Sequence, residues 1–155
     1  MEEKVVERWM NAALKGDAEA QYRLGMLYKR GTSNFSKSPS DALMYLEMAA
    51  EQGHVKACYH LGVLYTFGDG PRLIKGTIMP GDGLCERDDE KAKKYFDMAL
   101  RKLKVLVADG DADAFVWLSA MYKFGYGVEK DEGKARELLE QAADLGNPMA
   151  ETLVG

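Results

Sequence analysis

Apolar and small residues recur along the chain at fixed distances from four glycines, Gly16, Gly53, Gly110 and Gly146. Four residues after each of these glycines the chain has alanine, and eight residues after it has leucine or valine. A tyrosine stands twelve residues after each of the first three. These distances trace one face of an α-helix, so each unit is predicted to open with an amphipathic helix, helix A, of about fourteen residues.

Residues typical of helix ends mark both termini of helix A. Asp17, Asp111 and Asn147 follow aligned glycines, where their side chains can accept hydrogen bonds from the first amides of the helix. The first three A helices are each closed by a glycine that can adopt the left-handed conformation, at Gly31, Gly68 and Gly125. The helical prediction therefore has support at both ends.

A second amphipathic helix, helix B, is predicted to follow in each unit. Ser38, Asp88 and Asp131 each stand four residues before an alanine, at the place of an N-cap. The first residues of the chain fit the same pattern, so the chain opens on a helix B without its helix A. The predicted organisation is a single domain, 1-155, with helix B at 3-16, repeat 1 at 17-53, repeat 2 at 54-110, repeat 3 at 111-146 and a partial repeat at 147-155.

Small residues inside helix A predict a close approach of helix backbones. Gly25 and Gly62 occupy one equivalent position, and Ser119 occupies it in the third unit. An interior glycine costs a helix about 1 kcal/mol relative to alanine. We therefore expect these positions to relieve a steric limit, and their replacement to disturb packing.

The middle repeat is longer than the others, because the aligned glycines are spaced by 37, 57 and 36 residues. Relative to repeat 1, it has thirteen extra positions between Gly68 and Ala92 and seven between Ala92 and Gly110. The first set predicts an insertion at about 69-87 and the second an extension of helix B at about 101-107.

Long loops within compact domains are usually functional or disordered. We hypothesise that the insertion folds onto the helix extension as a lip, and the alternative is a mobile segment without a role. The apolar residues of this hypothesis are Leu73, Ile74, Ile78 and Met79 in the insertion and Leu103, Leu106 and Val107 in the extension.

A motif of small and apolar residues recurs in the runs Ala20-x-x-x-Leu24-Gly25-x-x-Tyr28-x-x-Gly31, Lys91-Ala92-x-x-Tyr95-x-x-Ala99, Tyr126-Gly127-Val128-x-x-Asp131 and Lys134-Ala135-x-x-Leu138-x-x-Ala142-Ala143-x-x-Gly146. This motif resembles the Sel1-like repeat of the tetratricopeptide-like superfamily, over nearly the whole chain apart from 69 to 87 and 101 to 107. The resemblance implies an all-α fold, a right-handed α-α superhelix of antiparallel helix pairs whose A helices line a concave, protein-binding surface. A cysteine-rich secreted branch of that family is linked to penicillin binding, but this chain lacks its paired cysteines.

The positions of helix A that packing does not use form a stripe rich in aromatic residues and arginine, the types that dominate binding hot spots. We predict that a partner protein or peptide binds there. The predicted partner-binding residues are Tyr22, Arg23, Met26, Arg30, Tyr59, His60, Val63, Phe67, Trp117 and Phe124. The alternative is that some of them, Phe67, Phe124 and Tyr59 above all, pack between neighbouring repeats.

Composition and charge narrow the range of possible functions further. The 155 residues are 46% hydrophobic and 30% charged, as in an ordinary folded domain. A net charge of -4, with no basic cluster longer than Arg101-Lys102, disfavours nucleic acid as a partner. Neither a secretory signal nor a membrane-length apolar run is visible, so a cytosolic protein without membrane contact is expected, unless a signal was removed.

Candidate catalytic and metal-binding groups are few. Cys58 falls in a helical apolar pattern and is expected in the core, and Cys85 falls in a glycine-rich loop, so neither a disulfide nor a metal site is expected. His60 shares its turn with no second histidine and is interpreted as a polar groove residue. No positioned acid-base pair is visible, so neither catalysis nor a cofactor is expected.

The sequence thus favours an adaptor or regulatory protein that binds another protein. An inhibitor or immunity protein that blocks an enzyme is an alternative, and a hydrolase of cell-wall or lactam substrates, by family analogy, is disfavoured. The chain stops inside a fourth helix A with apolar Ala150, Leu153 and Val154. Either a longer natural protein was cut or self-association covers this C-terminal end.

Overall fold

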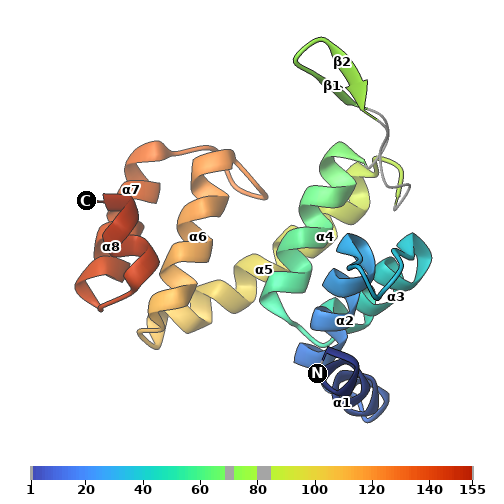
Figure 1. Cartoon of the computed structure of the whole chain (residues 1–155). Coiled ribbons are helices and arrows are strands. Elements are labelled where there is room, and N and C mark those ends of the chain that lie inside the picture. Colours follow the sequence, from blue (N-terminus) through green and yellow to red (C-terminus); the bar gives the residue numbers. More distant parts are fainter. Residues whose placement is uncertain (1, 69–71, 80–84, 155) are drawn as a thin grey trace. The chain divides into compact units, whose positions relative to one another are not determined.

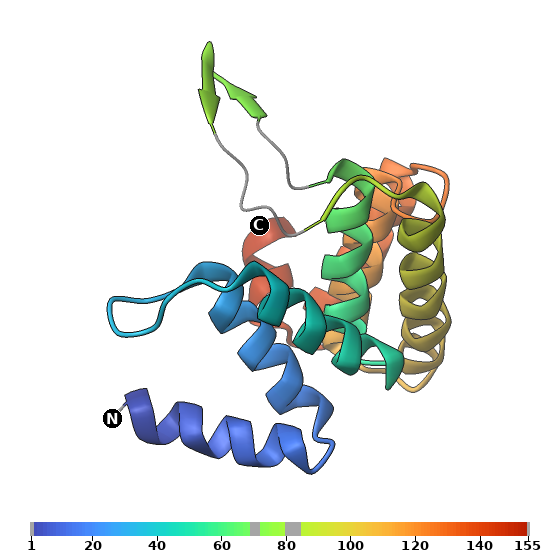
Figure 2. The ribbon, with the colours of Figure 1, turned by 90° about the vertical axis from the view of Figure 1, so that its right-hand side faces the viewer.

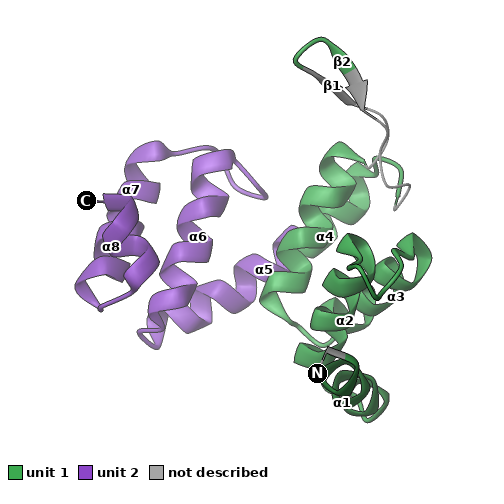
Figure 3. Cartoon of the chain, in the orientation of Figure 1, with its two compact units in different colours: residues 1–95 green, residues 96–155 purple. Residues whose placement is uncertain are grey.

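The chain, in a computed structural model that describes residues 2–68, 72–79 and 85–154, is built almost entirely of helices (Figure 1). Over these ranges it forms eight α-helices and one two-stranded antiparallel hairpin. The all-α fold class predicted from the sequence is confirmed. Two compact units divide the chain, Met1–Tyr95 and Phe96–Gly155 (Figure 3).

The first unit contains the first helix pair and the first helix of the second pair. Its helices are α1 (Glu2–Leu14), α2 (Ala18–Arg30), α3 (Pro39–Glu51) and α4 (Val55–Phe67), followed by strands β1 (Arg72–Ile74) and β2 (Thr77–Met79) and the start of α5 (Asp89–Ala108). The helix α2 packs against α1 and α3, and α3 packs against α4 (Figure 2). In the repeat pattern α2 and α4 are A helices, and α1, α3 and α5 are B helices.

The second unit contains the rest of α5, α6 (Ala112–Phe124), α7 (Glu132–Asp144) and α8 (Pro148–Val154). The helix α7 packs against both α6 and α8. The helix α5 has 20 residues whereas α3 has 13, so it is seven residues longer. Ala150 of α8, which packs against α7, is buried, whereas Leu153 and Val154 are exposed.

Each A helix begins with a side chain that caps its first amides. The N–H of the third helical residue donates to that side chain over 3.0 to 3.2 Å, in the pairs Ala20–Asp17, Ala57–His54, Ala114–Asp111 and Ala150–Asn147. The predicted caps Asp17, Asp111 and Asn147 are confirmed. His54 is an additional cap that uses its Nδ1 atom.

The B helices differ in their caps. Asp88 and Asp131 accept hydrogen bonds from helix amides at 3.1 and 3.0 Å, as predicted. Ser38 occupies the N-cap position of α3, as predicted, although its side chain accepts no hydrogen bond from a helix amide. Its hydroxyl donates to Asp41 Oδ2 at 2.7 Å.

A backbone hydrogen bond closes each of the three helix pairs at its open end. The N–H of the residue that precedes helix B donates to a carbonyl in the last turn of helix A, where such carbonyls lack helical partners. The bonds are Ser38–Tyr28 at 3.0 Å, Asp88–Tyr65 at 2.8 Å and Asp131–Tyr122 at 3.0 Å.

Small residues lie where the helices of a pair come closest, as predicted. A Cβ atom on Gly25 of α2 would lie 2.7 Å from Leu46 Cγ of α3. At the equivalent place in the second unit, the buried Ser119 hydroxyl donates to the Ala135 carbonyl at 2.7 Å. Gly62 is buried as well. Larger side chains would separate these helices.

The insertion contains a hairpin that the repeat pattern does not predict. Strands β1 and β2 pair in the register Leu73↔Ile78, and the turn residues Lys75 and Gly76 have φ values of 50° and 81°. Two positive φ values are typical of the tight turns that match the strand twist of hairpins. The side chains of Leu73, Ile74, Ile78 and Met79 lie outside the described residues, so the lip stays a hypothesis.

Across the described ranges, no helix is both long enough and apolar enough to cross a bilayer.

Candidate partner-binding site

Four rings from α2, from α4 and from the residue that caps α4 form an aromatic cluster in the first unit. The Tyr22 ring of α2 stacks on His54 with centroids 4.7 Å apart, and on His60 of α4 at 5.9 Å. Tyr59 meets His60 edge to face at 5.8 Å. We call Tyr22, His54, Tyr59 and His60 the Tyr22 cluster. Because all four rings are partly buried, the cluster presents an aromatic surface that is fixed in place by its own contacts.

A carboxylate orients one side of this cluster. Because His54 Nδ1 accepts the Ala57 N–H, its Nε2 atom carries the hydrogen and donates to Glu19 Oε2 at 2.6 Å. Glu19 Oε1 accepts a second hydrogen bond from Arg23 at 3.1 Å. Partial burial acts to raise the pKa of Glu19, but the bonds from His54 and Arg23 outweigh it and hold that pKa below its usual value.

Arg23 is held in a defined position beside the cluster. Its guanidinium lies 5.7 Å from the centre of the Trp9 ring of α1, within the range of a cation–π contact. About half of its side chain remains exposed (52%). The guanidinium is therefore ordered before any partner arrives, and it still offers donors to that partner.

Positively charged side chains lie near His60 of the cluster. Burial, followed by the nearby charges of Lys29, Arg30 and Lys56, lowers the pKa of His60 to about 4. His60 is therefore neutral near pH 7. Arg30 and Lys56 are exposed, so their field extends into solvent. Burial also raises the pKa of Tyr22, so its hydroxyl stays protonated.

The depressed pKa of His60 predicts an acid-sensitive fold. Above about pH 6.5 the histidine is neutral in both the folded and unfolded chains and contributes no pH dependence. Between pH 6.5 and about 4 the unfolded chain takes up a proton that folded His60 does not, so stability falls by on the order of 2–3 kcal/mol over this window. His60→Gln is expected to flatten that slope in urea titrations at several pH values. Parallel slopes for the two proteins, or a His60 NMR titration centred near 6.5, would contradict this expectation.

The remaining predicted site residues fall in both units. Met26 and Val63 are partly buried on α2 and α4. Phe67 on α4 and Phe124 on α6 expose 62% and 54% of their surface, so they are not core residues. Trp117 on α6 is partly buried. In the second unit, the Phe124 ring lies 5.5 Å from that of Tyr126 and, over its face, 5.5 Å from Lys123 Nζ.

Metal and thiol chemistry receive no support from the described residues. Over those ranges no three His, Cys, Asp or Glu side chains gather as they would around a metal ion. Cys58 is buried, as predicted, and burial raises the pKa of its thiol to about 11. It is therefore a protonated core residue.

The helix pairs that carry these residues match the repeats of one protein family. The sequence model of the Sel1 repeat matches residues 18–54, 55–73, 77–102 and 112–147. The chain belongs to the Sel1 repeat family. Sel1 repeat proteins are generally protein-interaction modules and are typically not enzymes.

Two curated relatives of this Sel1 protein are much longer than the matched region. It is 30% identical over 110 residues to the rat DAP3-binding cell death enhancer 1, covering 71% of this chain and 17% of the relative. It is 33% identical over 79 residues to Cyclin-F of Xenopus laevis, covering 51% of this chain and 9% of the relative. The match thus spans less than a fifth of either relative.

Solved structures show the same fold. A Sel1 repeat protein from Oxalobacter formigenes is 27% identical with a TM-score of 0.54, and the alignment covers 96% of both chains. The c5321 protective antigen of uropathogenic Escherichia coli, described as displaying an SLR fold, is 24% identical with a TM-score of 0.50, covering 94% of this chain and 34% of that chain.

The predicted binding residues did not include His54, Trp9 or Glu19, although Glu19 lies on the same outward stripe of helix A as Arg23 and Arg30. His54 had a detectable signal, because it occupies the column in which the other repeats carry Asp17, Asp111 and Asn147. A histidine in a capping column can cap through Nδ1 while its Nε2 atom remains available for a second bond. Trp9 joins the site through a tertiary contact, and Glu19 joins it through His54 as well as through Arg23 one turn away.

Proposed function

We propose that this Sel1 protein is a non-enzymatic interaction module, an adaptor or regulator, that binds a partner through the helix A face of α2 and α4. The observation that carries this proposal is the Tyr22 ring stacked on both His54 and His60. Rings already fixed by such contacts lose little conformational entropy when a partner covers them. The name of the rat relative states that it binds DAP3, which supports protein binding as the role of such repeats.

The charges around the cluster favour a partner segment that carries carboxylates. Arg30 and Lys56 are exposed beside the neutral His60 ring, and about half of the Arg23 side chain is exposed. Tyrosine and arginine are among the residue types most enriched in binding hot spots. We therefore place Arg23, Arg30 and the Tyr22 cluster at the centre of the binding face. A cytosolic location, inferred from the sequence, belongs to the same proposal.

Arg30→Ala is the variant that tests this face most directly. Because Arg30 is exposed, its truncation is expected to change the free energy of unfolding by no more than about 0.5 kcal/mol. Binding of a partner captured from source-cell lysate is expected to weaken by about 2 kcal/mol, or about thirtyfold. The dissociation constant is measured by calorimetry with the purified partner.

The matched control is Arg101→Ala, which removes an exposed arginine from α5. The proposal requires the Arg101 variant to bind like the unchanged protein while the Arg30 variant does not. Equal affinity of all three proteins would place the partner elsewhere on the chain. Tyr22→Ala serves as a second test, because it removes the central ring of the cluster without changing the net charge.

A further inference from the structure

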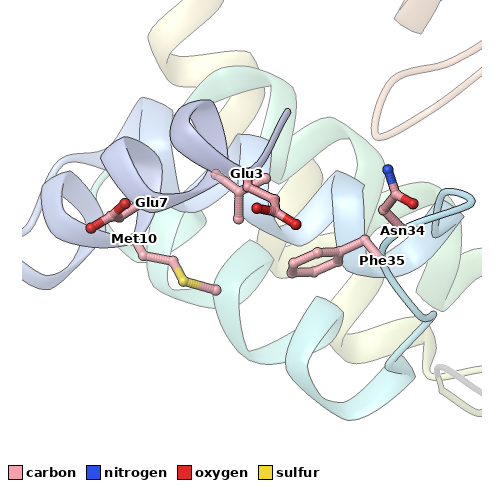
Figure 4. A pocket seen from close by; sticks show the side chains of 6 residues that line it. Glu3, Glu7, Met10, Asn34 and Phe35 are labelled. Atoms are coloured by element: carbon pink, nitrogen blue, oxygen red, sulfur yellow. The ribbon is translucent and has the colours of Figure 1, made fainter. Parts of the chain in front are cut away.

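A small pocket opens between α1 and the segment that joins α2 to α3 (Figure 4). Its volume is about 180 Å³. The lining residues are Glu3, Val6, Glu7 and Met10 of α1, with Asn34 and Phe35 of the connecting segment. None of them belongs to the Tyr22 cluster.

The floor of this pocket is apolar and fixed by the fold. Val6 is buried, and Met10 and Phe35 pack partly buried against the same core cluster. Phe35 is held by a tight turn in which the Thr32 N–H donates to its carbonyl at 2.7 Å, and its ring lies 5.0 Å from that of Tyr28. The pocket therefore exists before any ligand binds.

Two carboxylates stand at the rim of the pocket. Glu3 and Glu7 lie one helical turn apart on α1, and both are exposed. Figure 4 shows the Glu3 carboxylate on the side of Phe35 and Glu7 beyond Met10. Within the ranges that the structure describes, neither glutamate forms an ion pair or a side-chain hydrogen bond. Their negative charges are thus available to a cationic ligand.

The size of the pocket decides what it can hold. Small-molecule sites usually measure about 300–1,000 Å³, well above this pocket. An apolar cavity of about 150 Å³ holds a benzene ring, so a pocket of this volume fits a single aromatic or branched aliphatic side chain. A partner side chain inserted as an anchor is therefore the occupant that matches the pocket.

We propose that this pocket binds a basic segment of a partner protein by taking one apolar side chain onto Val6, Met10 and Phe35 while flanking lysines or arginines pair with Glu3 and Glu7. The flanking charges and the anchor are both required, because exposed ion pairs alone contribute little affinity. The pocket favours a positively charged partner segment, whereas the face of the Tyr22 cluster favours a negatively charged one. This proposal therefore does not depend on the function proposed above.

The test uses the full chain and a synthetic peptide with one phenylalanine between two pairs of lysines. In methyl NMR spectra, the Met10 and Val6 signals are expected to shift and saturate on titration, whereas those of the buried Met121 in the second unit stay unchanged. Two companion peptides carry glutamates in place of the lysines or alanine in place of the phenylalanine. Each is expected to bind at least about fivefold more weakly.

Charge removal from the rim provides the second measurement. The double variant Glu3→Gln and Glu7→Gln is expected to weaken the lysine peptide about fivefold and to reduce its salt dependence. The matched control, Glu137→Gln with Asp144→Asn, removes two exposed carboxylates from α7 and is expected to leave affinity unchanged. Absence of Met10 and Val6 shifts at millimolar peptide, or an equal loss of affinity in both double variants, would overturn the proposal.

Discussion

Leu61→Ala is expected to lower the free energy of unfolding by about 2–5 kcal/mol. Leu61 lies on α4 with 0% of its surface exposed, between the helices of the first unit. Its truncation removes the burial of the missing methyl groups and leaves a cavity that close-packed neighbours fill only in part. The loss is large against a total of about 5–15 kcal/mol for a domain. Urea denaturation followed by circular dichroism measures it.

The control for this prediction is another leucine truncation. Leu14→Ala, at the end of α1, changes a side chain that is 85% exposed and is expected to shift stability by no more than about 0.5 kcal/mol. The comparison separates burial from the change of residue type. Similar losses in both variants would contradict the packing described for α4.

Gly127→Ala is expected to destabilise the second unit by about 2–4 kcal/mol. Gly127 has a φ of 71°, and a left-handed conformation costs other residues about 1–2 kcal/mol. A Cβ atom there would also lie 2.7 Å from Phe96 Cβ and 3.2 Å from Leu100 Cδ1 of α5. Overpacking of this kind costs about 1–3 kcal/mol. Thermal and urea denaturation of the purified variant measure the loss.

Gly146→Ala separates the conformational penalty from the cost of the steric contact with α5. Gly146 has a φ of 87°, but a Cβ atom there would meet no described atom within 4 Å. Its replacement is therefore expected to cost only the conformational penalty of about 1–2 kcal/mol. The difference between the two variants then measures the contact of Gly127 with Phe96. A loss at Gly146 as large as that at Gly127 would show that packing against α5 contributes nothing.

Helix positions and the family were predictable because they depend on local chemistry repeated several times. Asp17, Asp111 and Asn147 cap helices through residues three positions away, and such bonds follow from sequence distance alone. Packing at Gly25 was also predictable, since a glycine inside a helix requires a compensating close contact. Ser38 marks the limit of this reasoning, because its N-cap position followed from the sequence but its hydroxyl bonds to Asp41 and not to a helix amide.

The details of the binding face were less predictable. Helical spacing placed Tyr22 and His60 on outward positions of two different helices, but their stacking depends on how α2 and α4 pack. The bond between Glu19 and His54 joins residues 35 positions apart, and no local pattern encodes it. The β1–β2 hairpin was missed because a strand of three residues gives almost no periodic signal. Only the Lys75-Gly76 turn between β-branched residues indicated it.

The backbone bonds that close the three helix pairs have a consequence for how such a protein can diversify. Peptide groups supply these bonds, at Ser38–Tyr28, Asp88–Tyr65 and Asp131–Tyr122, so the closure of a pair at its open end does not depend on the side chains of these residues. Outward residues can therefore be exchanged without opening the pair. A chimera that carries the outward residues of one pair on the backbone of another is therefore expected to keep the helix packing of the recipient pair.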